Sequence, residues 1–379
     1  MKPQTVWAHR LFFPAACLYA TIAVPLSVYA MTSGAGWPVA LLGQGHGFEM
    51  LFGFSLAVVA GYTLGPTEPG FLRALFAVWL LARIAQFWSP FSPATLSISV
   101  LFGLALAWRI VPRFVAAKKW RNKLLMPLLG GLCVLPAAYL VAQQSEAAML
   151  PRLVLYETVL FLSLLMAFMG GRIIAPAAAG ELYKQGYNLE ARVQPRIEAA
   201  FILLLMIAAP ALALPGGAVV AGTMLILAGI LVVFRLLRWQ LWRWRSRLDL
   251  VALGVGYAWL GIGIGLFGVA IASGSRTAAA LHILTVGALG TLTSGVMART
   301  HYQRTQRSSP PGILSVWMAG CIAIAALGRV LADLYTGVPK IGLLWLAASA
   351  WASCFGVLFW RFLVERLQSL QSRDETKTV

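Results

Sequence analysis

Long apolar stretches, each separated from the next by a short polar gap, run along the whole chain. Each stretch holds roughly 17–22 residues, and a helix of that length crosses the roughly 30 Å hydrocarbon layer of a bilayer. Only helices and closed barrels satisfy their backbone hydrogen bonds in that layer, and these stretches lack the alternation of a barrel strand. The pattern therefore predicts an all-α integral membrane protein.

About twelve transmembrane helices are expected, and the loops between them are too short to hold a soluble domain. We therefore expect one polytopic membrane domain over residues 1–379. The expected helices cover residues 11–31, 46–64, 71–88, 94–111, 124–141, 153–173, 197–214, 217–235, 250–272, 278–298, 313–332 and 342–362.

The composition agrees with this class. Hydrophobic residues make up 60% of the chain and charged residues only 11%, whereas about 25% of a soluble protein is charged. Nearly all of the 30 lysine and arginine residues fall in the termini and in the loops after even-numbered spans. The opposite side holds only Arg152, Arg276 and Lys340. By the positive-inside rule, both termini are expected in the cytoplasm, which requires an even number of spans.

The formal net charge of +18 does not indicate nucleic-acid binding, because the basic residues lie beside helix ends. There they meet anionic lipid head groups, at about 1 kcal/mol each. Between Arg235 and Arg247 tryptophan alternates with arginine, a pattern that suits the membrane interface. Membrane lipids are the expected partners, and no nucleic acid is expected.

Two of the four histidines, His46 and His282, each open an apolar span that runs from outside to inside. Both are therefore expected at a similar depth near the outer surface. Neutral imidazole is a common axial ligand of haem iron, so the pair predicts a bis-histidine haem. Hydrogen-bonded interfacial imidazoles are the alternative. His9 and His301 are expected in basic loops.

Ionisable side chains inside spans are candidates for function. Arg83 lies in the third span, and Arg329 and Asp333 lie one turn apart in the eleventh. Each arginine is expected either to bind a haem propionate or to pair with a carboxylate. Glu49 lies one turn after His46 and is expected either to accept a hydrogen bond from that ring or to carry protons.

Small residues on the two histidine spans have two interpretations. They leave room for a bulky planar ligand, or they let neighbouring helices pack closely. These residues are Gly53 and Gly61 on the second span and Gly287, Gly290, Ser294 and Gly295 on the tenth.

No catalytic pattern of a soluble enzyme is present: the chain has no Cys-x-x-Cys-His haem attachment, phosphate-binding glycine loop or serine elbow. Whether the protein is an enzyme is therefore left open by these residues. Any reaction would use a cofactor, and transport is the other possibility.

The chain resembles the NnrS family, membrane proteins linked to nitric oxide metabolism and reported to contain haem and copper. The resemblance covers most of the chain and is most specific in the second and tenth spans. It runs through Arg10-Leu-Phe-Phe-Pro14, His46-Gly-Phe-Glu-Met-Leu-Phe-Gly-Phe54, Leu80-Leu-Ala-Arg83, Met169-Gly-Gly-Arg-Ile-Ile-Ala-Pro176, Leu281-His-Ile-Leu-Thr-Val-Gly-Ala288 and Gly295-Val-Met297 with Arg299.

The second span departs from the family pattern. NnrS relatives commonly carry His-x-His-Glu-Met there, whereas this chain has Phe48 at the second histidine position. A copper ion or second haem that depends on that histidine would be lost or rebuilt, so copper is a doubtful expectation.

The second span is also similar to the His-Gly-x-x-Met-x-Phe motif of haem-copper oxidases, in which that histidine binds the low-spin haem. His282 matches the opposite axial ligand of those enzymes, while Ala280 stands where they have the high-spin haem ligand. The resemblance implies an oxidase-like bundle that keeps only a bis-histidine haem b.

Together, the residues and the resemblances imply an NnrS-like b-type cytochrome of the bacterial inner membrane. Electron transfer or a role in nitric oxide stress and denitrification is expected, with a quinol, a cytochrome or another membrane redox partner. A nitric oxide reductase with a further metal centre is one alternative, against which Phe48 and Ala280 count. A haem-free transporter is the other, but no clear internal repeat supports it.

Overall fold

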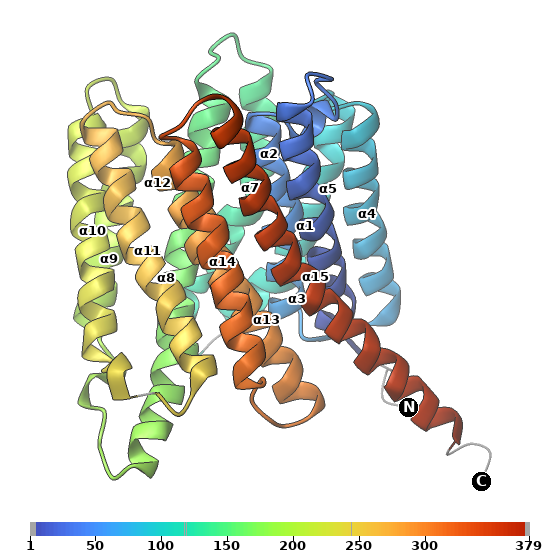
Figure 1. Ribbon diagram of the computed structural model, residues 1–379, viewed down its shortest axis with the longest axis vertical. Coiled ribbons are helices and arrows are strands. Elements are labelled where there is room, and N and C mark those ends of the chain that lie inside the picture. Colours follow the sequence, from blue (N-terminus) through green and yellow to red (C-terminus); the bar gives the residue numbers. More distant parts are fainter. Residues whose placement is uncertain (1–4, 117, 119, 244, 376–379) are drawn as a thin grey trace. The chain divides into compact units, whose positions relative to one another are not determined.

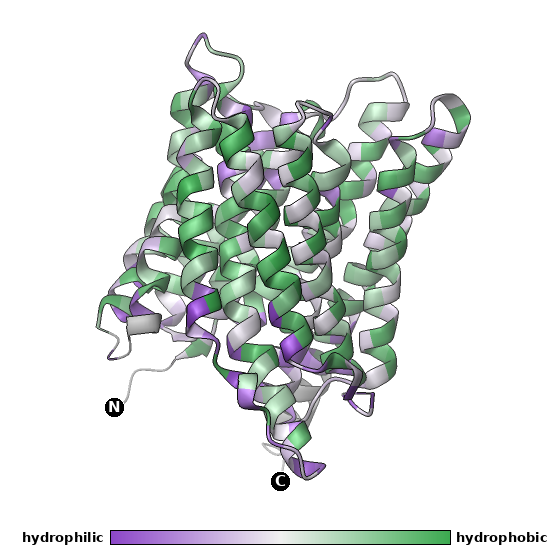
Figure 2. Cartoon of the chain, turned by 90° about the vertical axis from the view of Figure 1, so that its left-hand side faces the viewer, coloured by the Kyte–Doolittle hydropathy of each residue, from purple (hydrophilic) through white to green (hydrophobic). Residues whose placement is uncertain are grey.

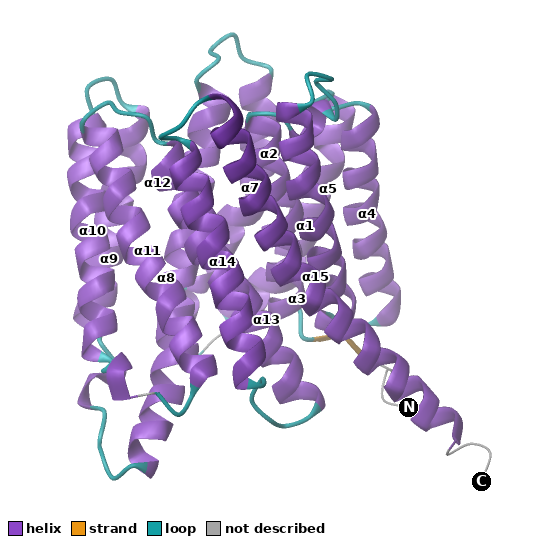
Figure 3. Cartoon of the chain, in the orientation of Figure 1, coloured by secondary structure: helices purple, strands orange, loops and turns teal. Residues whose placement is uncertain are grey.

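The structure is a computed structural model that describes residues 5–116, 118, 120–243 and 245–375. Almost all of this part of the chain is helical, as Figure 3 shows. The predicted all-α membrane class is confirmed. Short additional elements are the antiparallel strands β1 (Val6–Trp7) and β2 (Pro66–Thr67), and the short helices η1 (Val39–Leu41), α6 (Trp120–Lys123), η3 (Glu190–Arg192) and η4 (Leu241–Arg243).

Within the described residues, eleven helical segments are long and apolar enough to cross a membrane. They are α1 (His9–Thr32), α4 (Pro69–Trp88), α5 (Pro93–Val115), α7 (Leu125–Gln143), α8 (Leu150–Lys184), α9 (Pro195–Ala213), α10 (Ala218–Arg238), α11 (Leu248–Ala272), the composite α12–η5–α13 (Ala278–Thr305), α14 (Gly312–Ala332) and α15 (Gly337–Glu375).

The second predicted span, residues 46–64, is helical as well, as a composite helix. It consists of α2 (Gln44–Phe48), η2 (Glu49–Ser55) and α3 (Leu56–Thr63), which follow one another without a break. The other composite consists of α12 (Ala278–His282), η5 (Ile283–Ala288) and α13 (Leu289–Thr305). In both, the middle segment is a π-helix, whose hydrogen bonds join residues five apart and widen the turn.

Three helices extend well past the predicted spans. They are α8, α13 and α15, which end at Lys184, Thr305 and Glu375. After the predicted span, α8 continues with small and mixed residues, whereas α13 and α15 continue with mostly polar ones. A helix needs only continued backbone hydrogen bonding, which all of these residues permit. Hydropathy therefore predicts the apolar stretch of a helix and underestimates its length. Figure 2 shows hydrophilic positions gathered in loops and at helix ends.

The chain divides into two compact units. Unit 1 contains the chain up to Gln143, Met297–Ser308 and the chain from Trp351 onward. Unit 2 contains Gln144–Val296 and Ser309–Ala350. The unbroken helices α13 and α15 each contribute residues to both units. The expected single domain over residues 1–379 stays a prediction.

The core of unit 1 joins helices from both ends of the chain. The Trp351 indole in α15 donates a hydrogen bond of 3.2 Å to the carbonyl of Ala20 in α1. Phe54 of η2 packs edge-on against Phe355, with ring centroids 5.2 Å apart. The last helix is therefore an integral part of the core that the first helices build.

In unit 2, α10 lies beside α9 and α11 (Figure 1), and its contact with α11 depends on glycine. A Cβ atom on Gly229 would lie 2.6 Å from the carbonyl oxygen of Gly261, and one on Gly268 would lie 2.5 Å from that of Gly222. Close backbone approach at small residues is a common mode of helix association in membranes. The two helices therefore touch backbone to backbone.

We expect Gly229→Ala to destabilise the protein, because its new methyl group must push α10 away from α11. Overpacking of this kind costs about 1–3 kcal/mol. Thermal unfolding in detergent, followed by circular dichroism, should show a lower midpoint. Gly320→Ala is the matched control, because a Cβ there meets nothing within 4 Å. An unchanged midpoint for Gly229→Ala would contradict the close contact.

Candidate haem-ligand helices and buried ion pairs

His46 lies in the five-residue helix α2, directly before the π-helical segment η2. The chain enters this helix through Gly43, whose φ of +53° favours glycine. Gly45 then packs so closely on the backbone of Ala40 that a side chain would overlap it. These glycines allow the chain to turn sharply into the helix, and the half-buried imidazole of His46 lies in the first helical turn.

His282 is the last residue of α12 and directly precedes the π-helical segment η5. Its Nδ1 lies 2.6 Å from the carbonyl oxygen of Ala278, one turn earlier. Because a carbonyl only accepts, Nδ1 is the donor, and in the neutral ring Nε2 then carries the lone pair. A hydrogen bond at one ring nitrogen that fixes the tautomer is typical of histidines that bind metal through the other.

Both predicted ligands therefore share one local arrangement. In the described part of the chain, π-helical segments occur twice, at Glu49–Ser55 and Ile283–Ala288, and each follows one of these histidines within a turn. π-Helical turns inside α-helices are frequent at functional sites. His46 belongs to unit 1 and His282 to unit 2.

Glu49, the first residue of η2, forms a buried ion pair with Arg83 of α4. Arg83 Nη1 lies 2.6 Å from Glu49 Oε2, and the two side chains are 4% and 1% exposed. The Tyr19 hydroxyl donates to the same carboxylate oxygen, and Arg83 Nη2 donates to Ser99 Oγ at 2.8 Å. Of the two roles expected for Arg83, pairing with a carboxylate is the one observed.

Gly53 makes room for this ion pair. A Cβ at that position would lie 2.5 Å from Arg83 Nη1 and 3.1 Å from Glu49 Oε2. Its carbonyl also accepts a hydrogen bond of 2.9 Å from the Trp79 indole. Of the two interpretations of Gly53, the observed one is close packing, here against a guanidinium group.

Three more of these glycines, Gly61, Gly287 and Gly295, are also packed by protein. A Cβ on Gly61 would lie 2.6 Å from the Phe13 ring, and one on Gly287 would lie 3.1 Å from Trp259. One on Gly295 would lie 2.7 Å from Leu253. Close packing, the second of the two interpretations, accounts for these positions.

Arg329 pairs with Asp333 one turn later in sequence, with Nη1 2.9 Å from Oδ1. The two side chains are 20% and 25% exposed, so this pair is partly open to its surroundings. Here too, pairing with a carboxylate is the observed role.

A second buried ion pair lies in unit 2, and the sequence interpretation missed it. Glu198 in the first turn of α9 binds Arg235 in the last turns of α10, and both are 4% exposed. Arg235 Nη1 also donates to the Tyr257 hydroxyl at 3.2 Å and to the Ala167 carbonyl at 3.1 Å. Gly171 makes room for this pair as Gly53 does for the first.

A sequence signal for this pair existed. Glu198 lies within a predicted span, and Arg235 ends the next one. The start of one span and the end of the next lie on the same side of a membrane, so opposite charges there indicate a pair, because an unpaired charge in the membrane is costly. The interpretation of Arg235 as part of an interfacial segment overlooks this pairing.

The expectation that His9 and His301 lie in loops is wrong. His9 opens α1 and His301 lies in α13, and they are 1% and 7% exposed. His301 Nε2 lies 2.5 Å from Glu365 Oε2, and Arg304 Nη1 lies 3.1 Å from His9 Nδ1. The cause is the extension of α13 past its apolar stretch, which carries His301 and Arg304 onto the start of α1.

Among the residues that the structure describes, no three His, Cys, Asp or Glu side chains gather as a metal site would require. A haem held by two histidines needs only two protein donors, so it is not covered by this finding. Copper stays an untested expectation.

The long apolar helices define the class of this protein: it is a multi-pass helical membrane protein. Its exposed apolar side chains, such as Trp108, Met206 and Ile230, are suited to contact with lipid. A family model described as NnrS protein matches residues 5–366, and the chain belongs to the NnrS family. Comparisons with curated proteins and with solved structures gave no match. The expected likeness to haem-copper oxidases stays a prediction.

We expect the Glu198–Arg235 pair to stabilise unit 2 strongly. Arg235→Leu leaves a buried carboxylate without its cation, which costs about 3–5 kcal/mol. The double variant Glu198→Leu/Arg235→Leu should lose less than the two single variants together, because it leaves no uncompensated charge. Unfolding free energies in detergent test this.

The Arg329→Leu variant is the control, since a partly exposed pair contributes about 1 kcal/mol or less. If the double variant lost as much unfolding free energy as the two single variants together, a direct Glu198–Arg235 pair would be contradicted.

Proposed function

We propose that this NnrS protein is a b-type cytochrome whose haem iron is held by His46 and His282 as the two axial ligands. The observation that carries the proposal is the shared local structure of the two histidines. Each lies at the start of an apolar span and is followed within a turn by a π-helical segment.

The donor chemistry of His282 fits this role. Its Nδ1–H bond to the Ala278 carbonyl holds the ring in the tautomer whose Nε2 lone pair a metal needs. His46 is half-buried, so its ring is accessible to a haem bound within the protein.

Glu49, three residues after His46, belongs to a hydrogen-bonded network without net charge. Arg83 and Glu49 neutralise each other, and Tyr19 and Ser99 hold them in place. In our proposal this pair sets the electrostatics near the iron without adding a formal charge. A direct propionate contact of Arg83 or Arg329 remains a prediction, which leucine variants would test through haem retention.

Held by His46 and His282, a haem would supply one-electron redox chemistry and would offer a gas no free coordination position. Electron transfer in the bacterial inner membrane is therefore the function we propose, in nitric oxide stress or denitrification. A gas reductase would require a vacant coordination position, and a haem-free transporter would bind no haem at all.

We expect His46→Ala and His282→Ala each to deplete haem, because each removes one of two iron–protein bonds. Haem per folded protein, measured by the pyridine haemochrome method, is the readout. His9→Ala and His301→Ala are controls that should lower stability, since both rings are buried and hydrogen-bonded, but should retain haem in the folded fraction. Full haem content in both His46→Ala and His282→Ala would exclude the assignment.

A spectrum of the purified protein tests the coordination state. Reduction with dithionite should give sharp low-spin bands that carbon monoxide leaves unchanged, because no axial position is vacant. Bands shifted by carbon monoxide would indicate an open iron and favour the gas reductase. A colourless preparation from haem-replete cells would favour the transporter.

A further inference from the structure

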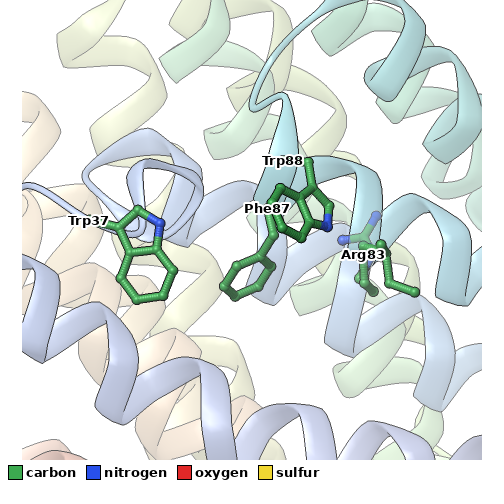
Figure 4. Close-up of a pocket in the computed structure, with 5 residues that line it drawn as sticks. Trp37, Arg83, Phe87 and Trp88 are labelled. Atoms are coloured by element: carbon green, nitrogen blue, oxygen red, sulfur yellow. The ribbon is translucent and has the colours of Figure 1, made fainter.

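Unit 1 contains a cavity of about 380 Å³ at the end of α4. It is lined by Trp37, from the loop between α1 and η1, and by Arg83, Ile84, Phe87 and Trp88 of α4. Figure 4 shows Trp37 on one side, Phe87 and Trp88 together at the helix end, and Arg83 further along the helix. A volume of this size is within the range of small-molecule sites.

Among the described residues that line the cavity, Arg83 is the charged one, and its side chain is only 4% exposed. Its two terminal nitrogens are engaged, Nη1 by Glu49 and Nη2 by Ser99. Its Nε is also buried but has no acceptor among the described residues. A guanidinium carries five N–H donors, and the bonds to Glu49 and Ser99 use one on Nη1 and one on Nη2. Each terminal nitrogen therefore keeps a second N–H that an oxygen atom of a ligand would accept from.

The charge at the cavity is already balanced. Because Glu49 neutralises Arg83, an anionic ligand such as a phosphate would bring an uncompensated charge into a mostly apolar pocket. A neutral ligand with a carbonyl or hydroxyl oxygen can accept a hydrogen bond from the guanidinium without that cost. The electrostatics therefore favour a neutral, oxygen-bearing ligand.

The other residues that line the cavity favour a ligand with an aromatic ring and a hydrophobic tail. Trp37, Phe87 and Trp88 offer three ring systems, and offset or edge-to-face contacts between rings are favourable. Trp88 is 85% exposed and Ile84 is 47% exposed. In a membrane-spanning helix such positions face lipid, so a tail attached to the ring can leave the cavity through its open side.

We propose that this cavity binds the head group of a membrane quinone or quinol, with its ring among Trp37, Phe87 and Trp88 and one ring oxygen accepting from Arg83. The inference names the class of redox partner. As a route for electrons it rests on the proposed haem, whereas the binding itself does not require haem.

Photoaffinity labelling of the full-length protein in phosphatidylcholine nanodiscs tests the binding. The probe is a short-chain ubiquinone with an azido group on its ring, and decylubiquinone is the competitor. Labelling should saturate at one probe per chain, should fall in the presence of decylubiquinone, and should map to peptides that contain Trp37 or Phe87. Label spread evenly over the lipid-facing helices would overturn the proposal.

Variants of the cavity wall sharpen the test. Trp37→Ala and Phe87→Ala should each weaken the competition by decylubiquinone by about three- to tenfold, the loss expected for one ring contact. Trp317→Ala is the matched control, because Trp317 in α14 is 50% exposed, close to the 55% of Trp37. Arg83→Lys should weaken binding while keeping a cation for Glu49, since lysine lacks the planar donor.

Haem content measured in the same samples separates the two proposals. If the protein contains haem but its labelling is unchanged by Trp37→Ala, Phe87→Ala and Arg83→Lys, the quinone site alone is overturned. Haem-free protein that is still labelled at Phe87 would overturn the haem assignment alone. Displacement of the probe by phosphatidylglycerol but not by decylubiquinone would assign the cavity to an anionic lipid head group and overturn the quinone proposal.

Discussion

A charge inside the hydrocarbon layer needs its counter-charge within the protein, and each unit meets this constraint in the same way. Unit 1 places Glu49 against Arg83, and unit 2 places Glu198 against Arg235. In both, a tyrosine hydroxyl joins the pair and a glycine leaves room for the guanidinium. Because a glutamate and an arginine on different helices must meet, each pair fixes how its two helices pack.

In unit 1, the proposed ligand His46 and the proposed quinone site both lie next to the Glu49–Arg83 pair. η2 carries Glu49 and begins just after His46, while Arg83 belongs to both the ion pair and the cavity wall. A disturbance of Glu49 or Arg83 would therefore reach the imidazole and the cavity together. The widened π-helical turn places Glu49 beside Arg83 and Tyr19, while His46 remains on the preceding α-helical turn.

Hydropathy predicted the twelve spans and the class because apolar length is a local property of the sequence. The partners of Arg83 and Arg329 were among the expected alternatives, because a membrane charge has few possible partners. The Glu198–Arg235 pair has a signal in the opposite charges of two consecutive spans. The buried state of His301 depends on how far α13 extends, which no local pattern encodes. The π-helical segments depend on a shift of backbone hydrogen bonding that leaves hydropathy unchanged.

The assembly of unit 1 from both ends of the chain has a consequence for biosynthesis. The helices α1 and η2 leave the ribosome long before Trp351 and Phe355, the α15 residues that pack on them. Until α15 is made, the surfaces of α1 and η2 that it covers must be shielded by lipid or by the insertion machinery. A chain truncated before Trp351 would therefore leave these surfaces without their native cover.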